Sequence, residues 1–437
     1  MKKRFSKPAS SNPLIELAKR AKMDKDPAIQ QMIFNVGMTN NPHVYKALLN
    51  RLKMKALIEE LDVFPFQPIQ EEDMISTIPV QNRLELGRVM NTNMPFCYDI
   101  FELTKHCAIF GQTGLGKTTL IMHLMTQAID NGVSVIAFDR IKKDFRYLTK
   151  KYKKLLVFSL ASAFQLGVLQ PPPGVSPKEW MVTFVQIFCK THSLLDNSEA
   201  LLLEAIDKLY RKFGTYNNSG VYPSLRHVSE HLKDLTLKGY SRTAQARDSV
   251  LSRLKIYLQI HPETFSSGTG FPLRELMDKS VVFELGGLTE HQCRFVINLL
   301  LYWVFLYRIA QGKKDIGLSH LIIIDEGKYL APKEFNTSIG FTPISYLYDQ
   351  FRALGGGLCL ATQSPGYLDN TVFVNSSLKV CYGLGHGEDI STIQKVFQLT
   401  DQQTEYVGGK LQKGQAIVKC SRFNGQPFVI EVPPFEI

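Results

Sequence analysis

The segment from residue 111 to residue 118 constrains the fold of this chain more than any other part of its 437 residues. Its sequence, GQTGLGKT, satisfies the pattern GxxxxGK[ST] at every position. Glycines in this pattern let backbone N–H groups turn inward around a phosphate, and a helix N-terminus adds the positive end of its dipole. The segment therefore predicts a phosphate-binding loop between a strand and a helix.

The flanking sequence supplies that strand and that helix. Cys107 to Phe110 is a short apolar run, and apolar residues recur at helical spacing from about Lys117 to Asn131. A glycine turn without a ligand would not need this context. Thr118 is expected to offer its hydroxyl to Mg²⁺ and Lys117 to reach the β and γ phosphates of ATP. The expected nucleotide-binding residues of the loop and helix start are Gly111, Gln112, Thr113, Gly114, Leu115, Gly116, Lys117, Thr118 and Thr119.

A second apolar run ends in two acids. Leu321 to Ile324 has the pattern of a buried strand, and Asp325 and Glu326 follow it directly. Ionised carboxylates beside apolar structure are costly unless they are paired or hold a metal. Together with the phosphate loop, the pair predicts that Asp325 holds Mg²⁺ and that Glu326 polarises an attacking water, so ATP hydrolysis is expected. Without the loop, the same pair could equally cap a helix.

Two further polar residues flank a third buried run, Gly357 to Ala361. Gln363 follows this run and could sense the γ-phosphate or align the water, although an ordinary strand-end amide would look the same. Arg352 precedes the run and is a candidate for a charge that reaches the nucleotide of a neighbouring subunit. A solvated surface arginine is the alternative for Arg352.

The order of these runs predicts an α/β fold with a mainly parallel sheet, because buried strands are separated by helices. Strand patterning fades between Pro171 and Pro262, where amphipathic helices indicate an insertion. Asn424-Gly425 favours a hairpin turn near the C-terminus. The expected domain division is an N-terminal helical module (1–74), a short β-rich segment (75–104), a first part of the ATPase core (105–165), a helical insertion (166–270) and a second part of the core (271–437).

Charge and apolar patterning limit the expected partners. A net charge of +11 and a pI of about 9.1 favour a polyanion. Arg140 to Lys154 contains eight basic residues and one acid, with aromatics between them. This segment could grip a nucleic-acid backbone or simply cover the outside of the sheet. Phe295 to Ile309 is shorter than the roughly 20 residues that span a bilayer, so a buried helix and no direct membrane insertion are expected.

Other features carry no chemistry of their own. Seven scattered cysteines without CxxC spacing do not indicate a disulfide framework, and the N-terminus lacks an apolar signal core, so we expect a cytoplasmic protein. His227 and His231 could share a metal, but neither an HExxH pattern nor a third ligand accompanies them. Surface histidines are therefore expected.

The motifs together resemble the HerA/FtsK superfamily of ring-forming DNA-pumping ATPases, which also contains the conjugative coupling and type IV secretion ATPases. The resemblance covers roughly residues 84 to 437, and residues 1 to 75 lie outside it. The matching pieces, in order, are LGRV (86–89), KHCAIFGQTG (105–114), Asp139-Arg140, VVFEL (281–285), Ile324-Asp325-Glu326, the segment 352–363 and LQKGQA (411–416).

The resemblance implies a RecA-like core, a homo-hexameric ring, ATP at the subunit interfaces and double-stranded DNA in the pore. By position, Arg352 resembles the trans-acting arginine of the family, and Lys105 resembles a basic residue that relatives place before the phosphate-loop strand. The β-barrel typical of HerA proteins is reduced here to the short stretch 75–103, and no transmembrane anchor of the kind found in many coupling proteins is expected.

The functional expectation is an ATP-hydrolysing ring motor that translocates double-stranded DNA with a partner nuclease or effector, in DNA processing or anti-phage defence. Two alternatives stay open. One is an oligomeric scaffold whose nucleotide state switches a partner effector, and the other is the cytosolic motor of a conjugation or type IV secretion system.

Overall fold

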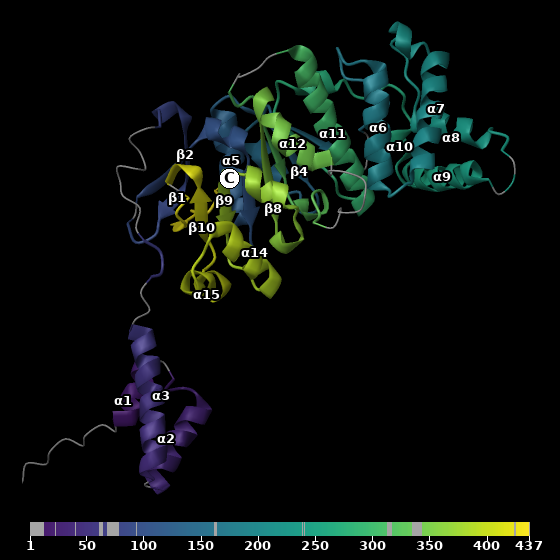
Figure 1. Cartoon of the computed structure of the whole chain (residues 1–437). Coiled ribbons are helices and arrows are strands. Elements are labelled where there is room, and N and C mark those ends of the chain that lie inside the picture. The colour runs from purple at the N-terminus through teal and green to yellow at the C-terminus, as the bar shows by residue number, and fades with distance from the viewer. Residues whose placement is uncertain are drawn as a thin grey trace, which may run out of the picture. The chain divides into compact units, whose positions relative to one another are not determined.

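A computed structural model describes the chain in two compact units, Met1–Gln67 and Pro68–Ile437 (Figure 1). The residues that the structure describes are 13–21, 23–39, 41–60, 64–67, 78–92, 94–160, 164–237, 239, 241–312, 317–333, 343–423 and 425–436.

The described residues of the first unit form three helices, α1 (Pro13–Arg20), α2 (Pro27–Thr39) and α3 (Pro42–Glu60). Each begins with proline, whose fixed φ suits a first helical turn and whose missing N–H would have had no partner there. The expectation of a helical N-terminal module is confirmed for the described residues of this unit. Their shared core consists of Leu14, Ala18, Ala21, Ile29, Val36, Leu48 and Leu52.

In the described residues of the second unit, eleven strands form one sheet with the order β2-β1-β11-β10-β9-β3-β8-β7-β4-β6-β5. Neighbours from β9 to β5 run parallel, whereas those from β9 back to β2 run antiparallel. The expected α/β class with a mainly parallel sheet is confirmed. The strands are β1 (Arg83–Val89), β2 (Pro95–Asp99), β3 (Cys107–Phe110), β4 (Ser134–Asp139), β5 (Leu156–Ser159), β6 (Val281–Glu284), β7 (His320–Ile324), β8 (Gly356–Thr362), β9 (Leu378–Cys381), β10 (Gln415–Cys420) and β11 (Phe428–Glu431).

Helices connect these strands and cover both faces of the sheet. They are α5 (Lys117–Asp130), α6 (Pro177–Thr191), α7 (Asp196–Lys212), α8 (Leu225–Lys233), α9 (Arg242–Ile260), α10 (Pro262–Phe265), α11 (Glu290–Gln311), α12 (Pro343–Gln350), α13 (Asn370–Asn375), α14 (Gly387–Phe397) and α15 (Asp401–Gly409). Among the 3-10 helices, η2 (Ile100–Lys105) contains Lys105, η3 (Phe145–Lys150) lies in the basic segment, and η7 (Phe351–Leu354) contains Arg352.

The expected helical insertion is present as α6 to α10, which follow β5 and precede β6 and appear in teal in Figure 1. Serine side chains begin three of its helices: Ser176 caps α6, Ser224 caps α8 and Ser241 caps α9. The insertion packs on α11 through aromatic rings, because Phe188 lies 5.7 Å from Phe295 edge to face. It is thereby fixed to the core.

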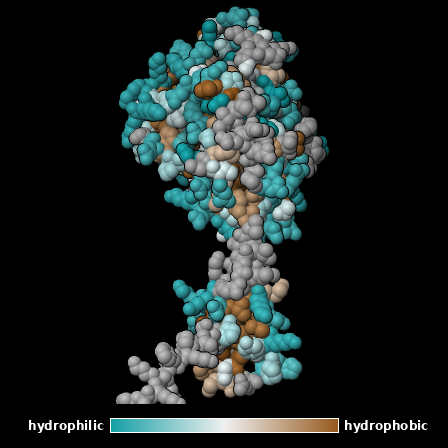
Figure 2. Space-filling view, turned by 90° about the vertical axis from the view of Figure 1, so that its left-hand side faces the viewer, coloured by the Kyte–Doolittle hydropathy of each residue, from teal (hydrophilic) through white to brown (hydrophobic). Residues whose placement is uncertain are grey.

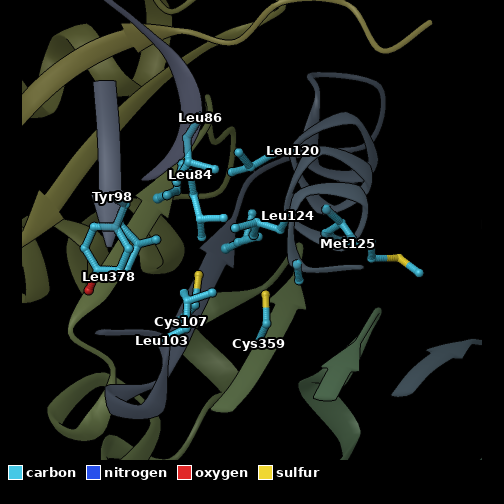
Figure 3. Close-up of a cluster of buried hydrophobic side chains, with 14 of the residues drawn as sticks. Leu84, Leu86, Tyr98, Leu103, Cys107, Leu120, Leu124, Met125, Cys359 and Leu378 are labelled. Carbon is cyan, nitrogen blue, oxygen red and sulfur yellow. The ribbon is translucent and has the colours of Figure 1, made fainter. Parts of the chain in front are cut away.

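Alternation along the parallel strands places two helices on opposite faces of the sheet. Leu120 and Leu124 of α5 pack with Leu84, Leu86 and Cys107 in one buried cluster, which Figure 3 shows. This packing fixes the helix that begins at the phosphate loop. On the other face, α11 covers Ile136, Phe138, Phe283 and Ile322 with Leu300, Trp303 and Val304.

Helix α11 explains the most apolar run of the sequence. Within the described part of the chain, it is the one helix long and apolar enough to cross a membrane, and 67% of its apolar window is buried. The capping box of Thr289 and Gln292 begins the helix, and Gly312 ends it in the left-handed conformation. The expectation of a buried helix over Phe295 to Ile309 is confirmed.

The antiparallel strands extend the sheet beyond the parallel core. Strands β1 and β2 pair with each other, and β1 joins the C-terminal pair through Val89 opposite Ile430. Strands β10 and β11 form the expected C-terminal antiparallel pair. The predicted turn at Asn424-Gly425 lies partly outside the described residues, because Asn424 is not among them.

Candidate nucleotide site

The glycine loop follows β3 and leads directly into α5. Gly111, Gly114 and Gly116 have φ values of +140°, +83° and +128°, a region that favours glycine. A Cβ at Gly111 would lie 2.5 Å from the Cβ of Tyr382, and one at Gly116 would lie 2.9 Å from a Tyr382 ring carbon. Both glycines are therefore required by conformation and by close approach.

Tyr382, directly after β9, is a supporting residue that the sequence did not indicate. It is fully buried under the loop, and its hydroxyl has no hydrogen-bond partner among the described residues. The segment after it also holds the loop, because Gln112 N donates to Gly383 O at 3.0 Å. The nearby glycines Gly383 and Gly385 were the available signal, since Gly385 leaves room for the Gln112 amide.

Lys117 is the first residue of α5 and is only 7% exposed. Its Nζ donates to Gly111 O at 2.5 Å and to Gln112 O at 2.9 Å, so the ammonium lies across the loop. Burial lowers the pKa of Lys117, and the charges of Glu326 and Asp325 oppose this shift. A phosphate could replace the two carbonyls as the partner of Lys117, so the loop fits a phosphate group.

The two acids follow β7 at the same edge of the sheet. Burial, and secondarily the charge of Glu326, raise the pKa of Asp325 to about 6. Glu326 has a φ of +57°, which is uncommon for a residue with a side chain, and its N–H donates to Asp325 Oδ1 at 3.0 Å. Carboxylate and hydroxyl oxygens are the donors that Mg²⁺ prefers, so Asp325 and Thr118 fit this cation chemically.

Gln363 connects the loop to the acids. It follows β8, which lies between β3 and β7 in the sheet. Thr113 Oγ1 donates to Gln363 Oε1 at 2.8 Å, and Gln363 Nε2 donates to Glu326 Oε1. The strand-end amide is therefore part of a chain of contacts from the phosphate loop to Glu326.

Arg352 and Lys105 lie at the opposite edge of the sheet. Both line a cleft of about 470 Å³ at the amino ends of β3, β8 and β9, and we call it the amino-edge cleft. Lys105 Nζ is 2.5 Å from Glu102 Oε2. The seven residues of β8 separate Arg352 from Gln363 by about 20 Å. Neither cation can therefore serve the loop of its own chain.

The basic segment Arg140 to Lys154 joins β4 to β5 through turns and η3. Arg146 makes a bidentate ion pair with the buried Glu284, with both contacts at 2.6 Å, and Phe145 packs in the core. Part of the segment therefore stabilises the fold. The lysines that remain exposed are Lys142, Lys143, Lys150, Lys151, Lys153 and Lys154.

The two histidines of the insertion do not form a metal site in the part of the chain that the structure describes. His227 completes the capping box of α8, because its Nδ1 accepts from Ser224 N at 3.0 Å. No three His, Cys, Asp or Glu side chains gather there to hold a metal ion.

The fold and this site define a P-loop ATPase of the HerA/FtsK superfamily. The family model described as "Helicase HerA, central domain" matches residues 84–304. The chain belongs to this family, and it is an ATP-hydrolysing enzyme.

Comparisons of sequence and of structure agree with this assignment. The DNA double-strand break repair helicase HerA of Sulfurisphaera tokodaii is 22% identical over 374 residues, or 80% of this chain and 72% of that protein. The protein with the same description from Saccharolobus solfataricus is 22% identical over 391 residues, or 83% of this chain and 73% of the relative.

Two solved structures share the fold. VirB4 of Thermoanaerobacter pseudethanolicus has a TM-score of 0.60 and 17% identity, over 82% of this chain and 98% of that chain. The plasmid coupling protein TrwB in complex with the non-hydrolysable ATP analogue ADPNP has a TM-score of 0.60 and 12% identity, over 82% of this chain and 91% of that chain.

Proposed function

We propose that this ATPase moves along double-stranded DNA as a ring of identical subunits. The observation that carries the proposal is the separation of the phosphate loop from Arg352 and Lys105, which lie at opposite edges of one sheet. A nucleotide contacted by both groups must lie between two copies of the chain. A closed ring of six copies, as the family resemblance implies, satisfies every such site with one kind of interface.

Each residue of the site has a role in the proposed hydrolysis. Lys117 and the loop N–H groups hold the β and γ phosphates, and Glu326 accepts a proton from the attacking water. Gln363 positions Glu326 and responds to the γ-phosphate through Thr113. Mg²⁺, when bound to Asp325 and Thr118, would neutralise part of the phosphate charge.

The proposed substrate of the motor is duplex DNA. The curated relatives are described as DNA repair helicases, and the net charge of +11 favours a polyanion. The exposed lysines around η3 supply phosphate contacts that Arg146 cannot, because its charge is paired with Glu284. Binding should therefore weaken with salt as counterion release requires.

The N-terminal helical unit is the proposed place for a partner nuclease or effector. Phe34 and Met38 of α2 are 65% and 75% exposed, and they line an apolar cleft of about 580 Å³ with Ile15 and Ile33. Figure 2 shows hydrophobic surface on this unit. Exposed apolar clefts of this kind are typical of protein interaction sites. The proposal also divides the chain into an N-terminal module, an ATPase core and a helical insertion. It places the protein in the cytoplasm.

A conjugation or secretion motor is the second candidate, favoured by one observation. VirB4 and TrwB share the fold over 82% of this chain. The two candidates differ in partner and not in the chemistry of the site.

Displacement of a triplex-forming strand tests the proposed movement directly. A motor that travels along duplex DNA should remove a third strand placed far from its loading end, at a rate that requires ATP. Glu326→Gln should bind ATP and leave the third strand in place. ATP hydrolysis without any displacement would contradict the translocase and favour the nucleotide-switched scaffold.

A further inference from the structure

The amino-edge cleft contains more basic side chains than Arg352 and Lys105, the two that the sequence predicted to act there. Besides Arg352 and Lys105, it is lined by Lys379 of β9 and Lys419 of β10. Asp349 is the one acid among its described lining residues, and its Oδ1 already accepts from Asn375 Nδ2 at 2.9 Å. Even with Lys105 paired with Glu102, the cleft therefore has an excess of positive charge.

Lys379 and Lys419 stand directly opposite each other in the antiparallel β9–β10 pair. Like charges at such positions destabilise a sheet. Burial, and then the charge of Lys419, lower the pKa of Lys379. An arrangement that opposes folding in this way indicates a ligand that the fold itself does not provide.

The hydrogen-bond partners of the two lysines are neutral. Lys379 Nζ donates to Ser376 O, and Lys419 Nζ donates to Gln398 Oε1 at 2.8 Å and to Val396 O at 3.3 Å. Within the described residues, neither ammonium forms an ion pair. The hydroxyl of Ser376, which also lines the cleft, is buried and has no partner there. Donors and positive charge therefore exceed acceptors.

We propose that Lys379 and Lys419 bind phosphate groups in the amino-edge cleft, and that these phosphates belong to a nucleotide on the loop of a second copy of this chain. This inference rests on the proposed function. The loop of the same chain lies at the other edge of the sheet, so the phosphates must come from outside the chain. A cleft of about 470 Å³ has the size of small-molecule sites in general.

Charge-neutralising variants test this assignment. The pair Lys379→Gln and Lys419→Gln, made together, should lower ATP hydrolysis at least tenfold. The midpoint of thermal unfolding without nucleotide should stay the same or rise, because a repulsive pair is removed. Lys212→Gln, on the exposed face of α7, is the matched control and should hydrolyse at the wild-type rate. The double Lys→Arg variant should retain activity, since it retains the charge. A double glutamine variant with the wild-type rate would overturn the inference.

Mixing variants shows whether the lysines act on a second copy. Lys117→Ala has a defective loop and an intact cleft, whereas the double glutamine variant has an intact loop and a defective cleft. A mixture in which their subunits exchange should hydrolyse ATP faster than the sum of the two proteins alone. A rate no higher than that sum would overturn the assignment to a neighbour's nucleotide.

DNA is the other source of phosphate, and binding of fluorescent duplex DNA separates the two. The double glutamine variant should keep the wild-type affinity for DNA. Weaker DNA binding with a wild-type rate of DNA-free hydrolysis would assign the cleft to the DNA backbone and overturn the inference. Failure of the proposed function gives a different result, because the wild-type protein would then hydrolyse ATP without displacing a third strand.

Discussion

The side-chain amide of Gln363 donates a hydrogen bond to the carboxylate of Glu326, joining the tips of β8 and β7. The same amide accepts from Thr113 in the phosphate loop. A phosphate that engages Thr113 would therefore alter the position of Glu326 through a single side chain. We therefore propose that Gln363 acts in hydrolysis and not in nucleotide binding.

Replacing Gln363 with alanine should lower kcat on the order of 10- to 100-fold, because Glu326 loses the group that orients it. The affinity for ATP should change less than threefold, since Lys117 and the loop are intact. Steady-state hydrolysis and binding of a fluorescent ATP analogue measure the two quantities. Gln245→Ala, on an exposed position of α9, is the control. Equal losses in affinity and kcat would contradict the positioning role.

Asp325→Asn should stabilise the nucleotide-free protein while abolishing hydrolysis. The pKa of Asp325 is raised to about 6 from an ordinary 3.8. The ionised carboxylate therefore destabilises the folded protein, and this effect is complete above pH 6. The stability that protonation provides is complete below 3.8 and is lost as the pH rises through 6. The difference between the folded and unfolded pKa values corresponds to about 3 kcal/mol at pH 7.5. Urea unfolding at pH 7.5 and 5 should show a gain that shrinks at pH 5, and a loss of stability at pH 7.5 would refute the account.

Tyr382→Ala should destabilise the protein by about 3–5 kcal/mol, because it empties a fully buried site under the phosphate loop. ATP binding should weaken with it, since Gly116 of the loop lies against this ring. Tyr382→Phe removes only a hydroxyl that has no partner among the described residues, and should be close to neutral. Chemical unfolding of both variants distinguishes ring packing from the hydroxyl; comparable losses in the two would show that the hydroxyl has a partner after all.

Three buried histidines should make the fold sensitive to mild acid. Burial lowers the pKa of His106 to about 4 and the pKa values of His192 and His320 to about 3. Below pH 6.5 the unfolded chain binds protons that the folded chain does not, so stability falls as the pH drops. Each histidine contributes about 1.4 kcal/mol per pH unit in this window.

Urea unfolding between pH 7 and 5 checks the histidine prediction. His192→Gln keeps a group that can bond to the Tyr257 hydroxyl, which lies 2.9 Å from His192 Nε2. This variant should show a shallower loss of stability with acid. Equal stability of the wild-type protein at pH 7 and pH 5 would count against buried neutral histidines.

Much of the fold could be predicted from the sequence, because its parallel strands are buried on both faces and appear as continuous apolar runs. Cys107 to Phe110 and Leu321 to Ile324 were identified within a residue of the observed strands. The helical insertion was recognisable because amphipathic spacing is a local property of the sequence. The order of the strands within the sheet was not predictable, since it depends on contacts between distant segments.

Some residues of the candidate site could also be predicted from the sequence, whereas others became apparent only in the fold. Residues within a local motif, such as Gly111 to Thr118, follow from the sequence, because their chemistry depends on near neighbours along the chain. Tyr382 and the contacts of Gln363 with Thr113 and Glu326 required the folded chain. The opposition of Lys379 and Lys419 is likewise a property of strand register and is invisible along the chain.

The most direct test of the central proposal is steady-state ATP hydrolysis with and without duplex DNA, at low and moderate salt, for wild type, Lys117→Ala and Glu326→Gln. The account predicts strong stimulation by DNA that weakens with salt and disappears in both variants. Hydrolysis that is lost in both variants but indifferent to DNA would contradict the DNA motor and leave an ATPase that switches a partner protein.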